Sequence, residues 1–231
     1  MRLAVGVLAA SVVLLAANDC CAKPTKFANR RGLLEDITEF INLVPLEKIE
    51  TVIKQWINKD PSVNAAFKFL DSGRYKEIID QGSRVSEFKN YLDFLEKSRA
   101  PAHDLWNFYR LLIGLDPLKQ LAKQTPPTLR TIDAAPLLQM VDECLEQIDK
   151  QQFEDLYNRK IEESEDFKYF VDRMDTKEHI NVRNALRESA EFKEIVSELL
   201  SNGIDMYGVF KKIFRFFFPG GIPHSSLTLF P

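Results

Sequence analysis

Ser86-Glu87-Phe88-Lys89-Asn90-Tyr91-Leu92 returns later in the chain as Ala190-Glu191-Phe192-Lys193-Glu194-Ile195-Val196, so Phe192 lies 104 residues after Phe88. The same step places Leu33 on Leu137 and continues the match of apolar residues over about a domain length. A constant step of this size predicts two tandem units with one structural plan. The match weakens between residues 72 and 85, and we expect a small shift of register there.

Apolar residues within each unit recur three and four residues apart, which is the spacing of one helix face. Prolines and glycines separate these segments, and Asp60-Pro61 is a typical helix start. In the first unit the expected helices span about 33–44, 46–57, 61–70, 74–80, 85–95 and 102–113. The second unit repeats this plan and ends in a helix over about 204–218. Alternating β-type segments and Asn-Gly or Asp-Gly hairpin turns are missing from the sequence, so we predict an all-α fold.

The first residues are typical of a signal peptide. Arg2 provides the positive charge, Leu3 to Ala17 form the apolar segment, and Cys20-Cys21-Ala22 offers a cleavage site. We predict a secreted protein that begins near Lys23, with an uncleaved membrane anchor as the alternative. The predicted organisation is a signal peptide (1–22), an N-terminal arm (23–32), repeat 1 (33–114), a connector (115–132), repeat 2 (133–218) and a C-terminal tail (219–231).

Composition and charge limit the classes of partner. The chain has 231 residues, of which 45% are hydrophobic and 28% charged, and this is ordinary for a globular protein. Its net charge of −3 and the missing basic runs argue against nucleic acid as a partner. Removal of the signal peptide leaves Cys144 as the one cysteine, so no internal disulfide can form. We expect Cys144 to be a small buried apolar residue, with a reactive thiol as the alternative.

Patterns that predict catalysis are missing. His103, His179 and His224 stand apart from one another and from any metal-ligand spacing. The sequence contains neither a glycine-rich phosphate loop nor a Gly-X-Ser-X-Gly motif, and the acidic run 162–166 is typical of a solvated helix start. We therefore expect a protein without enzymatic activity, cofactor or metal.

The apolar content allows two interpretations of the interior. The chain contains 17 phenylalanines, which suffice to fill a core formed by many short helices. Alternatively, the amphipathic helices enclose more apolar surface than they fill and leave a cavity for acyl chains. Periodicity alone does not separate a filled core from a cavity.

The sequence resembles the insect allergen-related repeat family, on the evidence of the paired Ser-Glu-Phe-Lys and Ala-Glu-Phe-Lys helices in a secreted, cysteine-poor chain with repeats of about 100 residues. That family includes the cockroach major midgut allergen and midgut microvillar proteins of mosquitoes. The resemblance implies two repeats that form a capsule around a large apolar cavity, which carries fatty acids or phospholipid acyl chains without catalysis. It also implies the gut lumen or the microvillar surface as the location, and lipids and membrane surfaces as partners.

The resemblance and the repeat together indicate residues that line such a cavity. The candidates are the paired apolar residues of the inner helix faces, each of which can instead pack against a neighbouring helix: Ile37, Ile41, Ile53, Phe67, Phe88, Leu92, Leu105, Val141, Leu145, Tyr157, Val171, Phe192, Val196 and Val209.

Two alternative functions stay open. The resemblance implies a likeness to membrane-active agents, to which mosquito members of the family are similar, and here the cationic, aromatic segment 211–216 is the candidate for membrane binding or lysis. The alternative for this segment is an ordinary terminal core helix whose basic residues lie near its C-terminal dipole. A related group in butterflies redirects plant-toxin breakdown to nitriles, which leaves a modifier of that chemistry as a further alternative.

Overall fold

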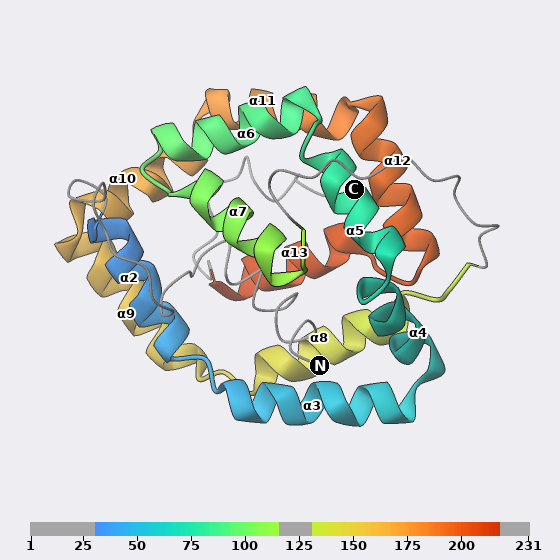
Figure 1. Cartoon of the computed structure of the whole chain (residues 1–231). Helices are drawn as coiled ribbons and strands as arrows, with labels where there is room; N and C mark the ends of the chain where they lie inside the picture. Colours follow the sequence, from blue (N-terminus) through green and yellow to red (C-terminus); the bar gives the residue numbers. More distant parts are fainter. Residues whose placement is uncertain (1–30, 116–130, 218–231) are drawn as a thin grey trace.

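The protein is built of α-helices, as a computed structural model shows for residues 31–115 and 131–217 (Figure 1). This part of the chain contains twelve helices and no strand, which confirms the prediction of an all-α fold. None of these helices has the length and apolar character that crossing a membrane requires. The predicted signal peptide, nearly all of the arm, most of the connector and the C-terminal tail lie outside the described residues.

The helices before the connector are α2 (Arg31–Asn42), α3 (Leu46–Lys59), α4 (Pro61–Leu70), α5 (Gly73–Gly82), α6 (Ser86–Lys97) and α7 (Ala102–Leu112). Those after it are α8 (Ala135–Glu146), α9 (Lys150–Glu163), α10 (Glu165–Met174), α11 (Lys177–Glu188), α12 (Ala190–Ser201) and α13 (Met206–Phe217).

Each helix of the second set begins 104 residues after its counterpart in the first set, from α2 and α8 to α7 and α13. The small shift that we expected between residues 72 and 85 is wrong, because α5 begins at Gly73 and α11 at Lys177. The weak match there comes from a change of residue type at equivalent positions.

The helix ends agree with this step at the level of single hydrogen bonds. Asp60 caps α4 by accepting from the backbone N–H of Ser62 at 2.8 Å, and Ser164 caps α10 at the equivalent position by accepting from Phe167 at 3.2 Å. Both α6 and α12 end in a residue with positive φ, Arg99 at 71° and Gly203 at 80°. The chain therefore leaves both helices through the same left-handed turn.

Helices of the two halves also pack against one another. The helix α6 lies along α11, α5 along α12, and α3 and α4 against α8, while α2 contacts α9 and α10. In Figure 1 these helices form a ring, and α7 and α13 are drawn inside it. Both halves contribute residues to one buried apolar cluster, so they share one interior.

Candidate functional site

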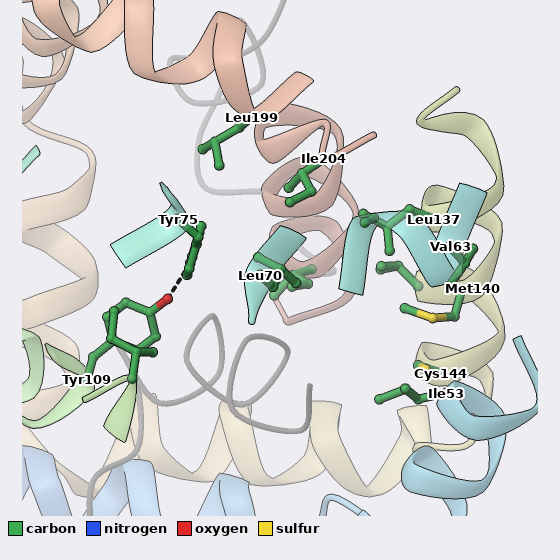
Figure 2. Close-up of a cluster of buried hydrophobic side chains, with 14 of the residues drawn as sticks. Ile53, Val63, Leu70, Tyr75, Tyr109, Leu137, Met140, Cys144, Leu199 and Ile204 are labelled. Carbon is green, nitrogen blue, oxygen red and sulfur yellow. Dashed lines mark hydrogen bonds between the residues drawn. The ribbon is translucent and has the colours of Figure 1, made fainter. Parts of the chain in front are cut away.

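The interior contains a large group of buried apolar side chains from both halves, which we call the main cluster. It comprises Val44, Ile49, Ile53, Trp56, Val63, Ala66, Leu70, Tyr75, Ile78, Val85, Tyr109, Ile113, Leu115, Leu137, Met140, Val141, Cys144, Ile148, Phe153, Leu186, Ile195, Leu199, Ile204 and Ile213. Figure 2 shows how Val63 from α4 and Ile53 from α3 lie against Met140 and Cys144 from α8.

A second cluster lies where α2, α6 and α10 approach one another. It comprises Leu33, Ile37, Phe94, Ala100, Phe167, Phe170 and Met174. The ring of Phe40 joins the two clusters, because it lies 4.8 Å from the ring of Phe153 in the main cluster and 5.4 Å from that of Phe167 in the second. The apolar interior therefore continues from one cluster to the other.

The structure distributes the fourteen predicted lining residues over this interior. Three of them are buried members of the clusters: Ile53 and Val141 in the main cluster, and Ile37 in the second. Eight are half-buried at the cluster edges: Phe67, Phe88, Leu145, Phe192 and Val209 at the main cluster, and Ile41, Tyr157 and Val171 at the second. Leu92 and Leu105 are buried and Val196 is half-buried outside the two clusters. Their contact with a ligand stays a prediction.

Two tyrosine hydroxyl groups face each other within the main cluster. Tyr75 and Tyr109 share a short hydrogen bond between their oxygens, drawn in Figure 2. Burial raises the pKa of Tyr75 to about 12 and also raises the pKa of Tyr109. Both phenols are therefore neutral at physiological pH, and each satisfies the other in an apolar environment.

Cys144 lies at the centre of the contact between α3, α4 and α8. Its side chain is 1% exposed, and burial raises the pKa of the thiol to about 12. This confirms the prediction of a small buried apolar residue and makes the thiolate, which is the reactive form, rare at neutral pH.

The terminal segment 211–216 turns apolar side chains inward. Ile213 is 3% exposed, Phe216 packs on Phe153 with 5.8 Å between the rings, and Phe214 packs on the second cluster. Lys212 forms an ion pair with Asp142 at 2.6 Å. This arrangement agrees with the interpretation of the segment as a terminal core helix.

A groove of about 510 Å³ lies on the surface between α2 and α9. It opens to solvent, and Glu39, Asp155 and Arg159 are among the residues that line it. Because of these charges and its open form, this groove is distinct from the enclosed apolar cavity that the resemblance implies.

Sequence reasoning missed an unusual polar group between α6 and α11. Arg183 and His179 are 8% and 3% exposed, and they occupy the buried face of α11 together with Leu186. A signal for them was present, because the step of 104 residues pairs Arg183 with Ile79 and His179 with Tyr75. A shift of register is therefore the wrong interpretation of this mismatch.

Two comparisons with known proteins relate the chain to others. The model of the family described as insect allergen related repeat, nitrile-specifier detoxification matches residues 32–210. Protein G12 of Anopheles gambiae is 25% identical over 221 residues, which cover 94% of this chain and 99% of that protein.

Proposed function

The chain belongs to the insect allergen-related repeat family, and from this premise we propose that it is a secreted, non-enzymatic carrier of fatty acids or phospholipid acyl chains. The family match covers most of the described helices and confirms the resemblance found in the sequence. The proposed cargo site is an apolar cavity inside a capsule formed by the two halves.

The observation that supports this proposal best is the agreement between the two halves. Helix starts, the caps at Asp60 and Ser164, and the left-handed turns at Arg99 and Gly203 all repeat after 104 residues. We infer that the halves are tandem repeats whose apolar faces close around a common interior. Two equivalent sets of amphipathic helices with a common interior can form the wall of a cavity that takes long hydrocarbon chains.

The energetics of such a site are favourable. Each methylene transferred from water gains about 0.8 kcal/mol, so a long acyl chain contributes on the order of 10 kcal/mol before the costs of ordering. The half-buried residues at the cluster edges, such as Phe67 and Val209, are the first candidates for contact with the chain. Secretion into the gut lumen or to the microvillar surface is part of the proposal and rests on the predicted signal peptide.

Organic extraction of the purified protein followed by mass spectrometry tests the proposal. We expect acyl lipids in about stoichiometric amount. Val209→Trp places a larger side chain at the edge of the main cluster and lowers the amount of lipid per protein. The control Leu46→Trp changes a side chain that is 50% exposed and leaves this ratio unchanged. A lipid-free extract from folded wild-type protein refutes the carrier.

A second candidate function, membrane binding or lysis, is favoured by the surface of α7. Phe108, Leu111 and Leu112 are 38%, 57% and 51% exposed, and their spacing places them on one helix face. We propose this face as the part that contacts membranes when cargo is exchanged. Replacing all three residues with Ser lowers leakage from lipid vesicles, whereas Leu200→Ser, at a site 48% exposed on α12, does not. Equal leakage from both variants argues against this face.

The description of the family also names nitrile-specifier detoxification. A modifier of plant-toxin chemistry therefore stays as an alternative to the carrier. Its test is product analysis of glucosinolate hydrolysis with and without the protein. A higher share of nitriles with the protein supports the modifier, and an unchanged product ratio argues against it.

A further inference from the structure

Arg183 places a charged guanidinium in the protein interior, and two of its nitrogen atoms have no hydrogen-bond partner in the described part of the chain. The residue is 8% exposed, and its Nε and Nη1 atoms are buried with no hydrogen-bond acceptor in residues 31–115 and 131–217. Buried charged groups are expensive unless they are paired, and each unsatisfied one in a native protein calls for a physical explanation.

The surroundings of Arg183 are basic and aromatic. His179, one turn earlier on α11, donates from Nδ1 to the carbonyl of Met174 at 2.6 Å, and its ring lies 5.3 Å from the ring of Phe94. The guanidinium carbon of Arg173 lies 4.9 Å from the centroid of the Phe94 ring. The Nε atom of Arg173 is buried and has no hydrogen-bond partner in the described chain. Arg173 donates to the carboxylate of Glu178, which is half exposed. The group therefore carries an excess of positive charge next to flat apolar walls.

Tyr91 of α6 and Arg187 of α11 complete these surroundings. Burial raises the pKa of the Tyr91 hydroxyl, and the nearby Arg183 guanidinium opposes this rise. Arg187 lies 5.9 Å from the ring centroid of Tyr207, at the start of α13. Arg183 therefore lies beside Tyr91 of α6, while Arg187, one turn later on α11, contacts α13.

The other half of the molecule forms the same helix contact without these charges. The contact of α5 with α12 is equivalent to that of α11 with α6, and there Ile79 and Ile195 take the places of Arg183 and Tyr91. Ile195 is 9% exposed and Ile79 packs on the main cluster. Apolar residues at these two positions are therefore compatible with this packing, and the charge of Arg74 in the same contact is paired with Glu198 at 2.6 Å. Replacing buried ions by apolar residues is often neutral or stabilising. The charge of Arg183 needs another reason.

We propose that the guanidinium of Arg183 binds the oxyanion of an acyl lipid, a carboxylate or a phosphate, while the hydrocarbon chain lies in the apolar interior. This inference rests on the proposed carrier function and adds a polar end to its site. A guanidinium presents its N–H donors in a planar fork that fits carboxylate and phosphate oxygens, and its bonds to these anions are among the stronger hydrogen bonds of proteins.

Binding measurements on delipidated protein test the inference. The probes are oleate, oleyl alcohol, which has the same chain without the anion, an acyl-chain phosphatidic acid, and inorganic phosphate. Wild-type protein binds oleate and the phosphatidic acid at least about tenfold more tightly than the alcohol, as expected for bonds to a buried charged group. Arg183→Met removes this preference and leaves the affinity for the alcohol unchanged.

Two further variants separate charge from folding. Lys193→Met removes one positive charge from an exposed side chain of α12 and keeps the wild-type preference. Arg183→Lys keeps the charge without the fork and retains part of the preference. Since Ile79 serves at the equivalent position, Arg183→Met is expected to fold, as circular dichroism checks. Should it fail to fold, Arg183→Lys decides, and an undiminished preference in that variant overturns the inference.

The outcomes distinguish the two proposals. Failure of both oleate and oleyl alcohol to bind wild-type protein refutes the carrier itself. Binding of both with equal affinity, or a full preference in Arg183→Met, overturns the role of Arg183 and leaves the carrier intact. Inorganic phosphate that binds alone and does not compete with oleate shows a site for a free anion, and this result also overturns the inference.

Discussion

Gly203→Ala is expected to destabilise the protein strongly, because glycine is needed there for two independent reasons. Gly203 follows the C-cap of α12 and has a φ of 80°, a backbone conformation that is unfavourable for residues with a Cβ. A Cβ at this position would also lie 2.8 Å from Cγ2 of Ile132. Ile132 is held close to the end of α12, because its backbone N–H donates to the carbonyl of Ser201 at 2.9 Å.

The two effects have separate magnitudes. The left-handed conformation costs about 1–2 kcal/mol for a residue with a Cβ. The steric overlap with Ile132 costs about 1–3 kcal/mol, which is the usual range for overpacking. We therefore expect the free energy of unfolding to fall by about 2–5 kcal/mol in Gly203→Ala. Removing Cγ2 with Ile132→Ala relieves most of the overlap and none of the backbone cost.

Urea denaturation followed by circular dichroism measures both parts. In a double-mutant cycle, Gly203→Ala and Ile132→Ala should couple favourably by about 1–2 kcal/mol. Gly73→Ala is the matched control, because nothing lies within 4 Å of a Cβ there, and we expect a change of about 0–1 kcal/mol towards higher stability. A loss below about 0.5 kcal/mol in Gly203→Ala refutes the reasoning, and so does zero coupling with Ile132→Ala.

Three further predictions concern pH, thiol reactivity and an ion pair. Burial lowers the pKa of His179 below its ordinary 6.5, with Arg183 and Arg173 adding to the effect. The unfolded chain then binds more protons, so stability should fall as the pH decreases below about 6.5. In urea denaturation, His179→Gln should reduce the dependence of the unfolding free energy on pH. The exposed His103→Gln is the control. An unchanged pH dependence in His179→Gln contradicts the role given to His179. Cys144 should react with a thiol reagent only as fast as the protein unfolds, because its thiol is buried and burial raises its pKa to about 12. Fast labelling of the native protein would contradict this prediction. Glu198→Gln should lower the free energy of unfolding by about 1–3 kcal/mol, because both Arg74–Glu198 bonds measure 2.6 Å between largely buried side chains. Glu50→Gln, which removes an exposed ion pair with Lys54, is the control. A loss in Glu198→Gln that is no larger than the loss in Glu50→Gln would contradict the prediction.

The local structure could be predicted from the sequence in detail. Helix starts follow from short-range signals such as Asp60 before Pro61, and the side chain of Asp60 caps α4 as expected. The burial of Cys144 follows from its place in an apolar helix face. The helix starts and caps depend on contacts within a few residues of the chain, whereas the burial of Cys144 needs only that its helix face be covered.

The candidate site could be predicted only in part. Apolar periodicity located the inner faces, and residues such as Ile53 and Val141 are buried in the main cluster. It could not interpret Arg183, because a charged residue on an apolar face looks like an error of register until its neighbours are known. It also gave no sign that Phe216 turns inward while Phe108 is exposed, since both lie in apolar terminal helices of their halves.

The sequence by itself determined the helices, their caps and the constant step between the two halves, because these depend on local hydrogen bonding and backbone preference. Only the tertiary structure decided that α6 lies on α11 and α3 on α8, and that Arg183 is buried. The physical reason is that one apolar helix face fits many others equally well. The choice of partner is made by the packing of all twelve described helices at once, and no segment of sequence contains that information alone.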